Sequence, residues 1–211
     1  PAQAFFGMGL TSVALPQGLK KIGEGAFSGC SALTSIVIPD SVTEIGNSAF
    51  NSCINLTYIE LPNSLESIDE YAFADCYQLS KIHLSANLEE IGKYAFASCP
   101  NLKSITLSAR LRDISGFNAF LHSDSLESIY LRAPIPPAYS DDQMSEYKNL
   151  SIYVPKESYE LYLSSNDWVL WRDYFKPYDY GDLSEFKPEY FSSDFSKNML
   201  IDTFQMATIG D

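Results

Sequence analysis

The sequence lacks a long apolar run and lacks an excess of positive charge. No stretch approaches the roughly 18 consecutive apolar residues of a membrane helix, so we expect no transmembrane segment. The 211 residues include 14 Lys and Arg against 27 Asp and Glu, which gives a net charge of −13. Because nucleic acids and anionic membrane surfaces attract basic patches, both are poor partners for this chain.

Histidine and cysteine are also scarce, and catalytic signatures are missing. Zinc sites need clustered ligands such as C-x2-C, whereas the four cysteines are each 23 residues apart and only His83 and His122 accompany them. The sequence contains no G-x-x-x-x-G-K-[ST], H-E-x-x-H or G-x-S-x-G motif. We therefore expect no metal, no cofactor and no enzymatic activity.

A repeat of 23 residues dominates the first two thirds of the chain. The repeats begin at seven leucines, the first five spaced by 23 residues and the last two by 24: Leu10, Leu33, Leu56, Leu79, Leu102, Leu126 and Leu150. Such a period indicates a solenoid, because one repeat buries its apolar face only by stacking on its neighbours. Function is therefore expected on a surface and not in a pocket.

Each clear repeat opens with alternating apolar residues, as in Leu56-x-x-Ile59-x-Leu61, which predicts a short strand that a proline then ends. Parallel strands stack about 4.8 Å apart, so equivalent side chains should form buried columns. We expect one column of phenylalanine, one of isoleucine and one of cysteine. The cysteines are predicted to be buried free thiols at positions 30, 53, 76 and 99.

The repeat resembles the BspA-like leucine-rich repeat family over about residues 4 to 175. The family pattern L-x-x-I-x-L-P-x-S-L-x-x-I-G-x-x-A-F-x-x-C is matched from Leu33 to Cys53 and recurs in neighbouring repeats. The segment 152–155, followed by Tyr159, Tyr162 and Trp168, resembles the family's closing unit, in which a last strand leads into a short aromatic helix. Commoner leucine-rich repeats carry an asparagine after the strand, and here that column reads Gly18, Ser41, Ser64, Asn87 and Arg110.

These observations predict a β-rich leucine-rich-repeat solenoid with a parallel strand ladder of about seven rungs and a C-terminal cap. The solenoid would span residues 1–175, including a degenerate repeat at 126–149 and the cap at 150–175. The proline-rich segment 133–137 should prevent the usual second apolar stretch in the degenerate repeat. Residues 176–211 form an acidic, aromatic tail or the start of a further module. Residues 4–8 read as the end of a repeat, so we expect upstream sequence.

Outward strand residues are the candidate site, because packing already explains the inward ones. Tyrosine near a cation is typical of recognition surfaces, which favours Tyr58, Lys81, His83 and Tyr130. Glu60, His83 and Thr106 share one column in an order reminiscent of a catalytic triad. An open sheet face offers no oxyanion donors and threonine is a poor nucleophile, so we expect contact residues there and no catalysis. A merely solvated face is the alternative.

The resemblance implies a secreted or cell-surface location, since the family occurs in such proteins of bacteria and some protozoa. It also implies adhesion to a protein ligand, such as a host extracellular-matrix protein or another cell-surface protein. A structural spacer or oligomerisation arm of a larger surface protein is a second hypothesis. An enzyme, or a glycan-binding module using Trp168 and Trp171, is a third.

Overall fold

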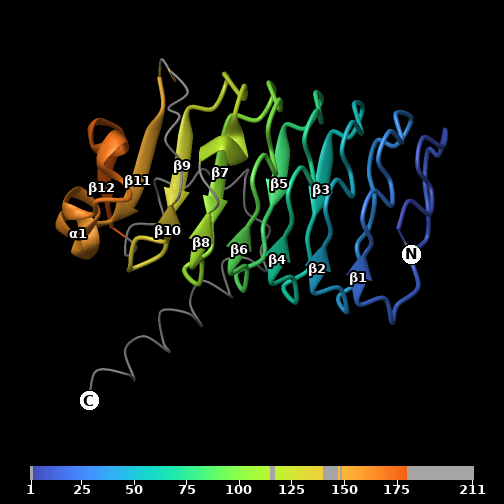
Figure 1. Ribbon diagram of the computed structural model, residues 1–211, viewed down its shortest axis with the longest axis horizontal. Coiled ribbons are helices and arrows are strands. Elements are labelled where there is room, and N and C mark those ends of the chain that lie inside the picture. Colours follow the sequence, from blue (N-terminus) through green and yellow to red (C-terminus); the bar gives the residue numbers. More distant parts are fainter. Residues whose placement is uncertain (1, 115–116, 140–146, 148, 180–211) are drawn as a thin grey trace. The chain divides into compact units, whose positions relative to one another are not determined.

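The computed structural model describes residues 2–114, 117–139, 147 and 149–179. Residues 1–178 form one compact unit, and residues 179–211 are a separate unit. The first unit is a stack of coils (Figure 1). The repeats that begin at Leu56, Leu79, Leu102 and Leu126 each contain two strands, and the first two repeats contain one strand each. Every helix in the described ranges is too short or too polar to span a membrane. The predicted solenoid with a parallel strand ladder is confirmed.

One side of the stack carries the strands that the alternating apolar residues predict. β3 (Tyr58–Glu60) pairs in parallel with β5 (Lys81–His83), and a four-stranded parallel sheet follows in the order β7, β9, β11, β12. These are Ser104–Leu107, Ser128–Leu131, Ser151–Pro155 and Phe175–Tyr178. We call the outward surface of both sheets the strand face.

The strand predicted over Leu33–Ile38 is wrong in extent, because only Val37 pairs, through an isolated bridge to Glu60. Apart from Val37, the outward residues of the first two repeats are small: Ser12, Ala14 and Ser35. Cross-strand pairs of larger side chains support a ladder, and such pairs begin at Tyr58. Regular pairing therefore starts at the third repeat.

A second side carries a six-stranded parallel sheet of two-residue strands. These are β1 (Lys21–Ile22), β2 (Glu44–Ile45), β4 (Ser67–Ile68), β6 (Glu90–Ile91), β8 (Asp113–Ile114) and β10 (Ala138–Tyr139). Each isoleucine points inward and is buried. β10 corrects one prediction: the proline-rich segment does not prevent a second stretch. The prolines end at Pro137, before the strand, so the Ala138 N–H still donates to Arg112 in the sheet.

The third side is a ladder of backbone hydrogen bonds without regular strands, which we call the turn ladder. It comprises residues 24–29 and the equivalent segments 47–52, 70–75 and 93–98. Alternate N–H groups donate to carbonyls of the next repeat, as from Phe50 to Ala72 and from Phe73 to Ala95, both at 2.8 Å. Two residues per segment have positive φ, a conformation that costs free energy for any residue but glycine. Six are not glycine: Ser48, Ser52, Tyr71, Asp75, Tyr94 and Ser98.

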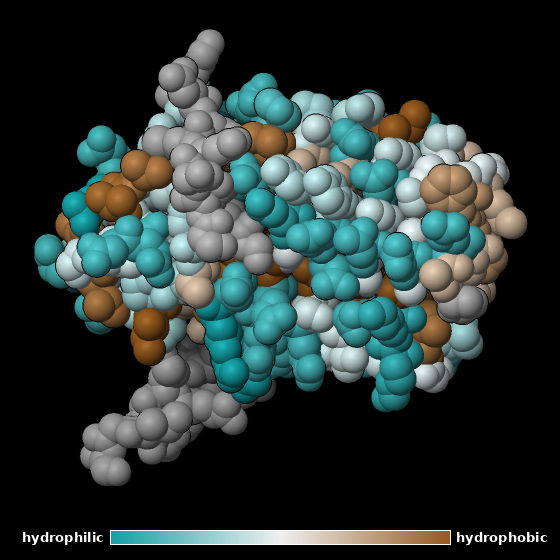
Figure 2. Space-filling view, in the orientation of Figure 1, coloured by the Kyte–Doolittle hydropathy of each residue, from teal (hydrophilic) through white to brown (hydrophobic). Residues whose placement is uncertain are grey.

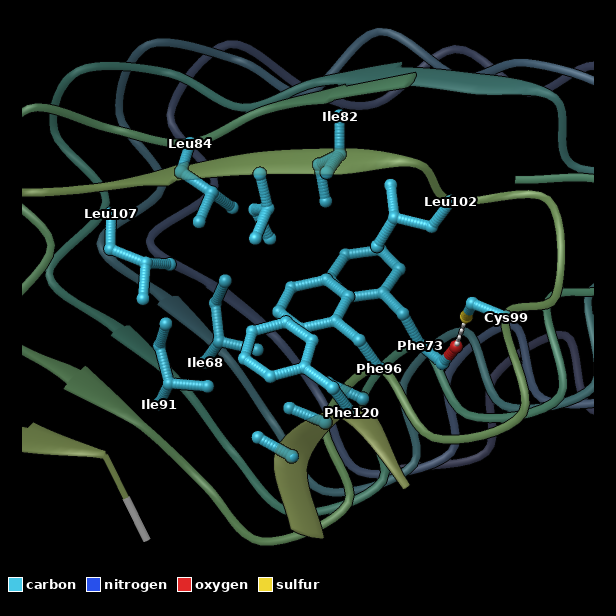
Figure 3. Packing of buried hydrophobic residues seen from close by; sticks show 14 of the residues in the cluster. Ile68, Phe73, Ile82, Leu84, Ile91, Phe96, Cys99, Leu102, Leu107 and Phe120 are labelled. Atoms are coloured by element: carbon cyan, nitrogen blue, oxygen red, sulfur yellow. Dashed lines mark hydrogen bonds between the residues drawn. The ribbon is translucent and has the colours of Figure 1, made fainter. Parts of the chain in front are cut away.

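The core consists of the predicted columns (Figure 3). Phe27, Phe50, Phe73, Phe96 and Phe120 form a continuous stack, with ring centroids 5.2 to 5.8 Å apart and nearly parallel planes. All four cysteines are free and buried, as predicted. Their thiols donate to phenylalanine carbonyls of the preceding repeat, at 3.2 Å from Cys53 to Phe27 and 3.3 Å from Cys76 to Phe50.

Polar side chains near the start of the second side replace the asparagine column of commoner leucine-rich repeats. Ser41 donates to the Leu19 carbonyl at 2.7 Å, and Ser64 donates to that of Val42 at 2.6 Å. Further along, Ser85, Asn87 and Ser108 donate to carbonyls of Asn63 and Ala86. Side-chain hydroxyl and amide groups thus donate to backbone carbonyls of the preceding repeat.

The cap closes the first unit at the C-terminal side and packs on the degenerate repeat. It contains β11, η2 (Lys156–Ser158), α1 (Tyr159–Ser164), η3 (Val169–Tyr174) and β12, while η1 (Phe117–Phe120) belongs to an earlier repeat. Trp168 donates to the Pro137 carbonyl at 2.9 Å, and Trp171 donates to the Tyr139 hydroxyl at 3.0 Å. Both tryptophans are fully buried. The hypothesis that they form an exposed glycan platform is therefore wrong, because they seal the core.

Candidate functional site

The strand face collects all six residues predicted to bind a partner. In β3 and β5, Tyr58 lies opposite Lys81, and Glu60 lies opposite His83. In the next sheet, Thr106 lies opposite Tyr130. Alternation places these side chains outward, while Ile59, Ile82, Ile105 and Ile129 between them are buried.

The sheet is not continuous through this site. β3 pairs with β5, and β7 pairs with β9, but among the described residues no ladder joins β5 to β7. The six residues therefore fall into two groups, with Tyr58, Glu60, Lys81 and His83 in the first and Thr106 and Tyr130 in the second. Glu60, His83 and Thr106 follow one another in successive repeats, as predicted, but the strand pairing is interrupted between His83 and Thr106.

The first group is held together by contacts around Tyr58. Its hydroxyl donates to Glu60 Oε2 at 3.0 Å, and its ring meets His83 edge to face with centroids 6.1 Å apart. Burial of the ring raises the pKa of Tyr58 to about 12, and the hydrogen bond and negative charge of Glu60 add to that rise. Tyr58 is therefore a neutral donor at physiological pH, fixed in one orientation by its neighbours.

Val37 extends this group, and sequence reasoning did not select it. Its side chain is 82% exposed, the highest value among the exposed large hydrophobic residues of the described chain. The bridge between Val37 and Glu60 places it in the same column, one repeat earlier. We name Val37, Tyr58, Glu60, Lys81 and His83 the central cluster. The alternation of the repeat places Val37 outward, and this position could have identified it as a candidate contact residue.

Tyr130 of the second group belongs to a set of packed tyrosines. Tyr130 and Tyr153 stack with centroids 4.7 Å apart, and Tyr178 meets Tyr130 edge to face at 6.1 Å. Lys176 of β12 lies opposite Tyr153 and is exposed. Neither Tyr153 nor Lys176 was among the predicted contact residues. Lys176 was unpredictable because the period had ended before β12.

The acid, imidazole and hydroxyl of the apparent triad do not form one unit. Glu60 and His83 are neighbours, but Glu60 accepts the hydrogen bond of Tyr58, and among the described residues no strand ladder pairs His83 with Thr106. Across the described residues, no three His, Cys, Asp or Glu side chains gather closely enough to hold a metal ion. The arrangement suits contact with a partner surface.

Acidic side chains are concentrated on the second side instead. Glu44, Glu90 and Asp113 occupy outward positions of its strands, and ion pairs join Lys21 to Glu44 and Arg112 to Glu89. Figure 2 shows that hydrophilic residues cover the middle of the visible surface, whereas hydrophobic ones appear toward its two ends. The strand face, with Glu60, Lys81 and Lys176, carries both signs of charge.

Comparison with known proteins identifies the repeat. The model of the BspA type leucine-rich repeat region matches residues 1–132 in six copies. A leucine-rich repeat protein of T. pallidum is similar in structure, with a TM-score of 0.63 and 30% identity over 68% of each chain. No curated protein matches the sequence significantly.

A second solved relative is a leucine-rich repeat protein of Bacteroides ovatus, with a TM-score of 0.52 and 28% identity. That similarity covers 68% of this chain but only 47% of the relative. Six matching copies and a neighbour of 30% identity agree with the columns and ladders described above. The chain belongs to the BspA type leucine-rich repeat family.

Proposed function

We propose that this chain is a non-catalytic module of a secreted or cell-surface protein and binds a protein ligand through its strand face. The central cluster carries the proposal. It places an exposed aliphatic residue, Val37, beside an ordered tyrosine and a lysine. These outward side chains take no part in the packing of the core. The family membership supports the extracellular location.

The composition of the central cluster suits protein recognition. Tyrosine is enriched among the energetically important residues of interfaces, and charged groups at their edge select the partner. The bond from Tyr58 to Glu60 and the contact with His83 fix the tyrosine before a partner arrives. Ordering in the free protein lowers the entropic cost of binding.

A catalytic role lacks the required chemistry at this face. A threonine nucleophile needs a base positioned beside it, and among the described residues no strand pairing aligns His83 with Thr106. Hydrolysis would also need donors aimed at a developing oxyanion. We therefore place binding above catalysis for the strand face.

The test is a binding screen of the immobilised 211-residue chain against extracellular-matrix proteins such as fibronectin and laminin. The variant replaces Tyr58, Lys81, His83 and Tyr130 by alanine, and a second variant is Val37→Ser alone. A matched control replaces Glu44 and Glu90 on the second side. Loss of binding in the strand-face variants with retention in the control supports the proposal. Equal binding by all the variants refutes it.

A structural arm is the second candidate, favoured by apolar residues on the cap. Leu161, Val169 and Leu170 are each between 45% and 47% exposed, on α1 and η3. Sedimentation velocity over a range of concentrations tests this candidate. Self-association that Leu161→Ser and Leu170→Ser abolish, together with no ligand in the screen, would favour the arm.

A further inference from the structure

A pair of stacked tyrosines lies on the turn ladder, outside the strand face. Tyr71 and Tyr94 occupy the same position in adjacent repeats, with ring centroids 4.9 Å apart and planes 21° apart. The two preceding repeats hold Gly25 and Ser48 at this position. Tyr71 is 40% exposed. The rings are therefore a local addition to the ladder.

The fold does not require these rings. Gly25, Ser48, Tyr71 and Tyr94 share a positive φ, between 54° and 59°, so the backbone is the same with or without a ring. A bulky side chain is disfavoured in that conformation, and glycine suits it best. Core packing does not explain tyrosine here, because the buried column of this segment belongs to the phenylalanines two residues later.

The stacking leaves one face of Tyr71 without an aromatic neighbour in the ladder. Tyr94 covers the face toward the C-terminal repeats. Ser48 occupies the equivalent position on the other side, and its short side chain donates to its own neighbour, Asn47 Oδ1, at 2.7 Å. A serine side chain cannot stack on a phenol ring, so Tyr71, which is 40% exposed, has no stacked partner on the side of Ser48.

Polar groups surround this surface. Within segments 24–29, 47–52, 70–75 and 93–98, Tyr71 is the one exposed large hydrophobic side chain. Asn47 and Glu70 directly precede Ser48 and Tyr71 in their repeats, and the Lys93 amine lies 5.7 Å from the Tyr94 ring centre. Protein hot spots are instead fully desolvated and ringed by packed contacts.

We propose that Tyr71, together with Asn47, Ser48 and Glu70, binds a neutral pyranose sugar of a glycan. The polarised C–H groups on one face of a pyranose complement the electron-rich face of a tyrosine ring. Its hydroxyl groups then meet the amide, hydroxyl and carboxylate beside the ring. The chain's net charge of −13 disfavours acidic sugars. This site is separate from the strand face and does not depend on the function proposed there.

The test is a titration of the ¹⁵N-labelled chain with cellohexaose, chitohexaose and mannohexaose, followed by amide chemical shifts. At least one sugar should shift the amides of Asn47, Ser48 and Tyr71, with millimolar or tighter affinity. Tyr71→Gly should weaken that binding by about tenfold or more while the fold remains intact, since glycine suits the positive φ. Tyr58→Ala, on the strand face, is the control and should bind the sugar as the unaltered chain does.

Two results would overturn the proposal. One is the absence of any shift at these amides with all three sugars. The other is equal sugar affinity of Tyr71→Gly and the unaltered chain. Shifts at the same amides caused by a matrix protein but by no sugar would assign the surface to a protein partner and would likewise reject the glycan.

Discussion

The thiol of Cys99 donates a hydrogen bond to the backbone carbonyl of Phe73, at 3.3 Å and one repeat earlier in the chain (Figure 3). The same relationship links Cys53 to Phe27 and Cys76 to Phe50. The cysteine column therefore does more than fill space. Each cysteine links its turn to the backbone of the preceding repeat by a hydrogen bond to the phenylalanine carbonyl.

We expect this column to make the chain sensitive to alkaline pH. Burial raises the pKa of Cys53 and of Cys99 from 9.0 to about 12. The folded state then holds these protons more tightly than the unfolded state does. Stability should be full below pH 9 and should fall as pH rises toward 12. Urea unfolding at a series of pH values measures the fall, and Cys99→Ala should flatten it. The same slope in both proteins would contradict this expectation.

Truncating the phenylalanine stack should be costly. Phe73 is fully buried, with rings of Phe50 at 5.2 Å and Phe96 at 5.4 Å. We expect Phe73→Ala to lower the free energy of unfolding by about 3 to 5 kcal/mol, the range for removing a buried aromatic side chain. Val37→Ala, on the exposed strand face, is the control and should change it by less than about 0.5 kcal/mol. An unchanged urea midpoint for Phe73→Ala would disprove the column as the core.

Glycine is required where the second side turns into the turn ladder. A Cβ added at Gly92 would lie 2.5 Å from the Glu70 backbone nitrogen and 2.6 Å from the Asp69 carbonyl carbon. We expect Gly92→Ala to destabilise the chain by about 1 to 3 kcal/mol, as overpacking does. Gly18→Ala, where a Cβ meets no atom within 4 Å, serves as control. Equal melting temperatures of the two variants would show that the repeats separate easily.

The geometry of the central cluster can be checked through the ionisation of Tyr58. Its pKa of about 12 reflects burial first and Glu60 second. Glu60→Gln removes the negative charge, so the pKa of Tyr58 should fall toward 10.0 but not reach it, because burial remains. NMR of ¹³C-labelled tyrosine across alkaline pH measures the change. Glu66→Gln, on the second side, should leave it unaltered, and a Tyr58 pKa unmoved by Glu60→Gln would remove the hydrogen bond from the cluster.

Much of the fold was predictable because it lies in the side-chain period. The phenylalanine, isoleucine and cysteine columns follow directly from residues that recur every 23 positions. The strand face follows from alternation, which is why Tyr58, Glu60, Lys81 and His83 were placed on one surface. The closing strand and helix were likewise expected, and they appear as β11 and α1.

The short strands, the turn ladder and the break in the sheet could not be predicted, because these backbone features depend only weakly on the type of side chain. Two-residue strands such as β4 are too short for any alternation to reveal. Tyr71 and Tyr94 adopt a positive φ that their side chains disfavour, so the turn ladder had no glycine signal in those repeats. The break between β5 and β7 depends on pairing between repeats. The sequence of a single repeat does not reveal such pairing.

The turn ladder has an electrical direction of its own. In the described turn segments, the inter-repeat bonds all run the same way, with the N–H pointing to the following repeat, as from Gly25 to Asn47 and from Ser48 to Glu70. Ordinary sheets have only small net dipoles. Here the aligned peptide dipoles add along the stack, as they do in a helix. On the second side the inter-repeat bonds run the opposite way, as from Gly46 to Ile22 and from Asp69 to Ile45. The two sides therefore carry opposed peptide dipoles, so a charged partner that lies along the turn ladder meets a local field opposite in direction to the field along the second side.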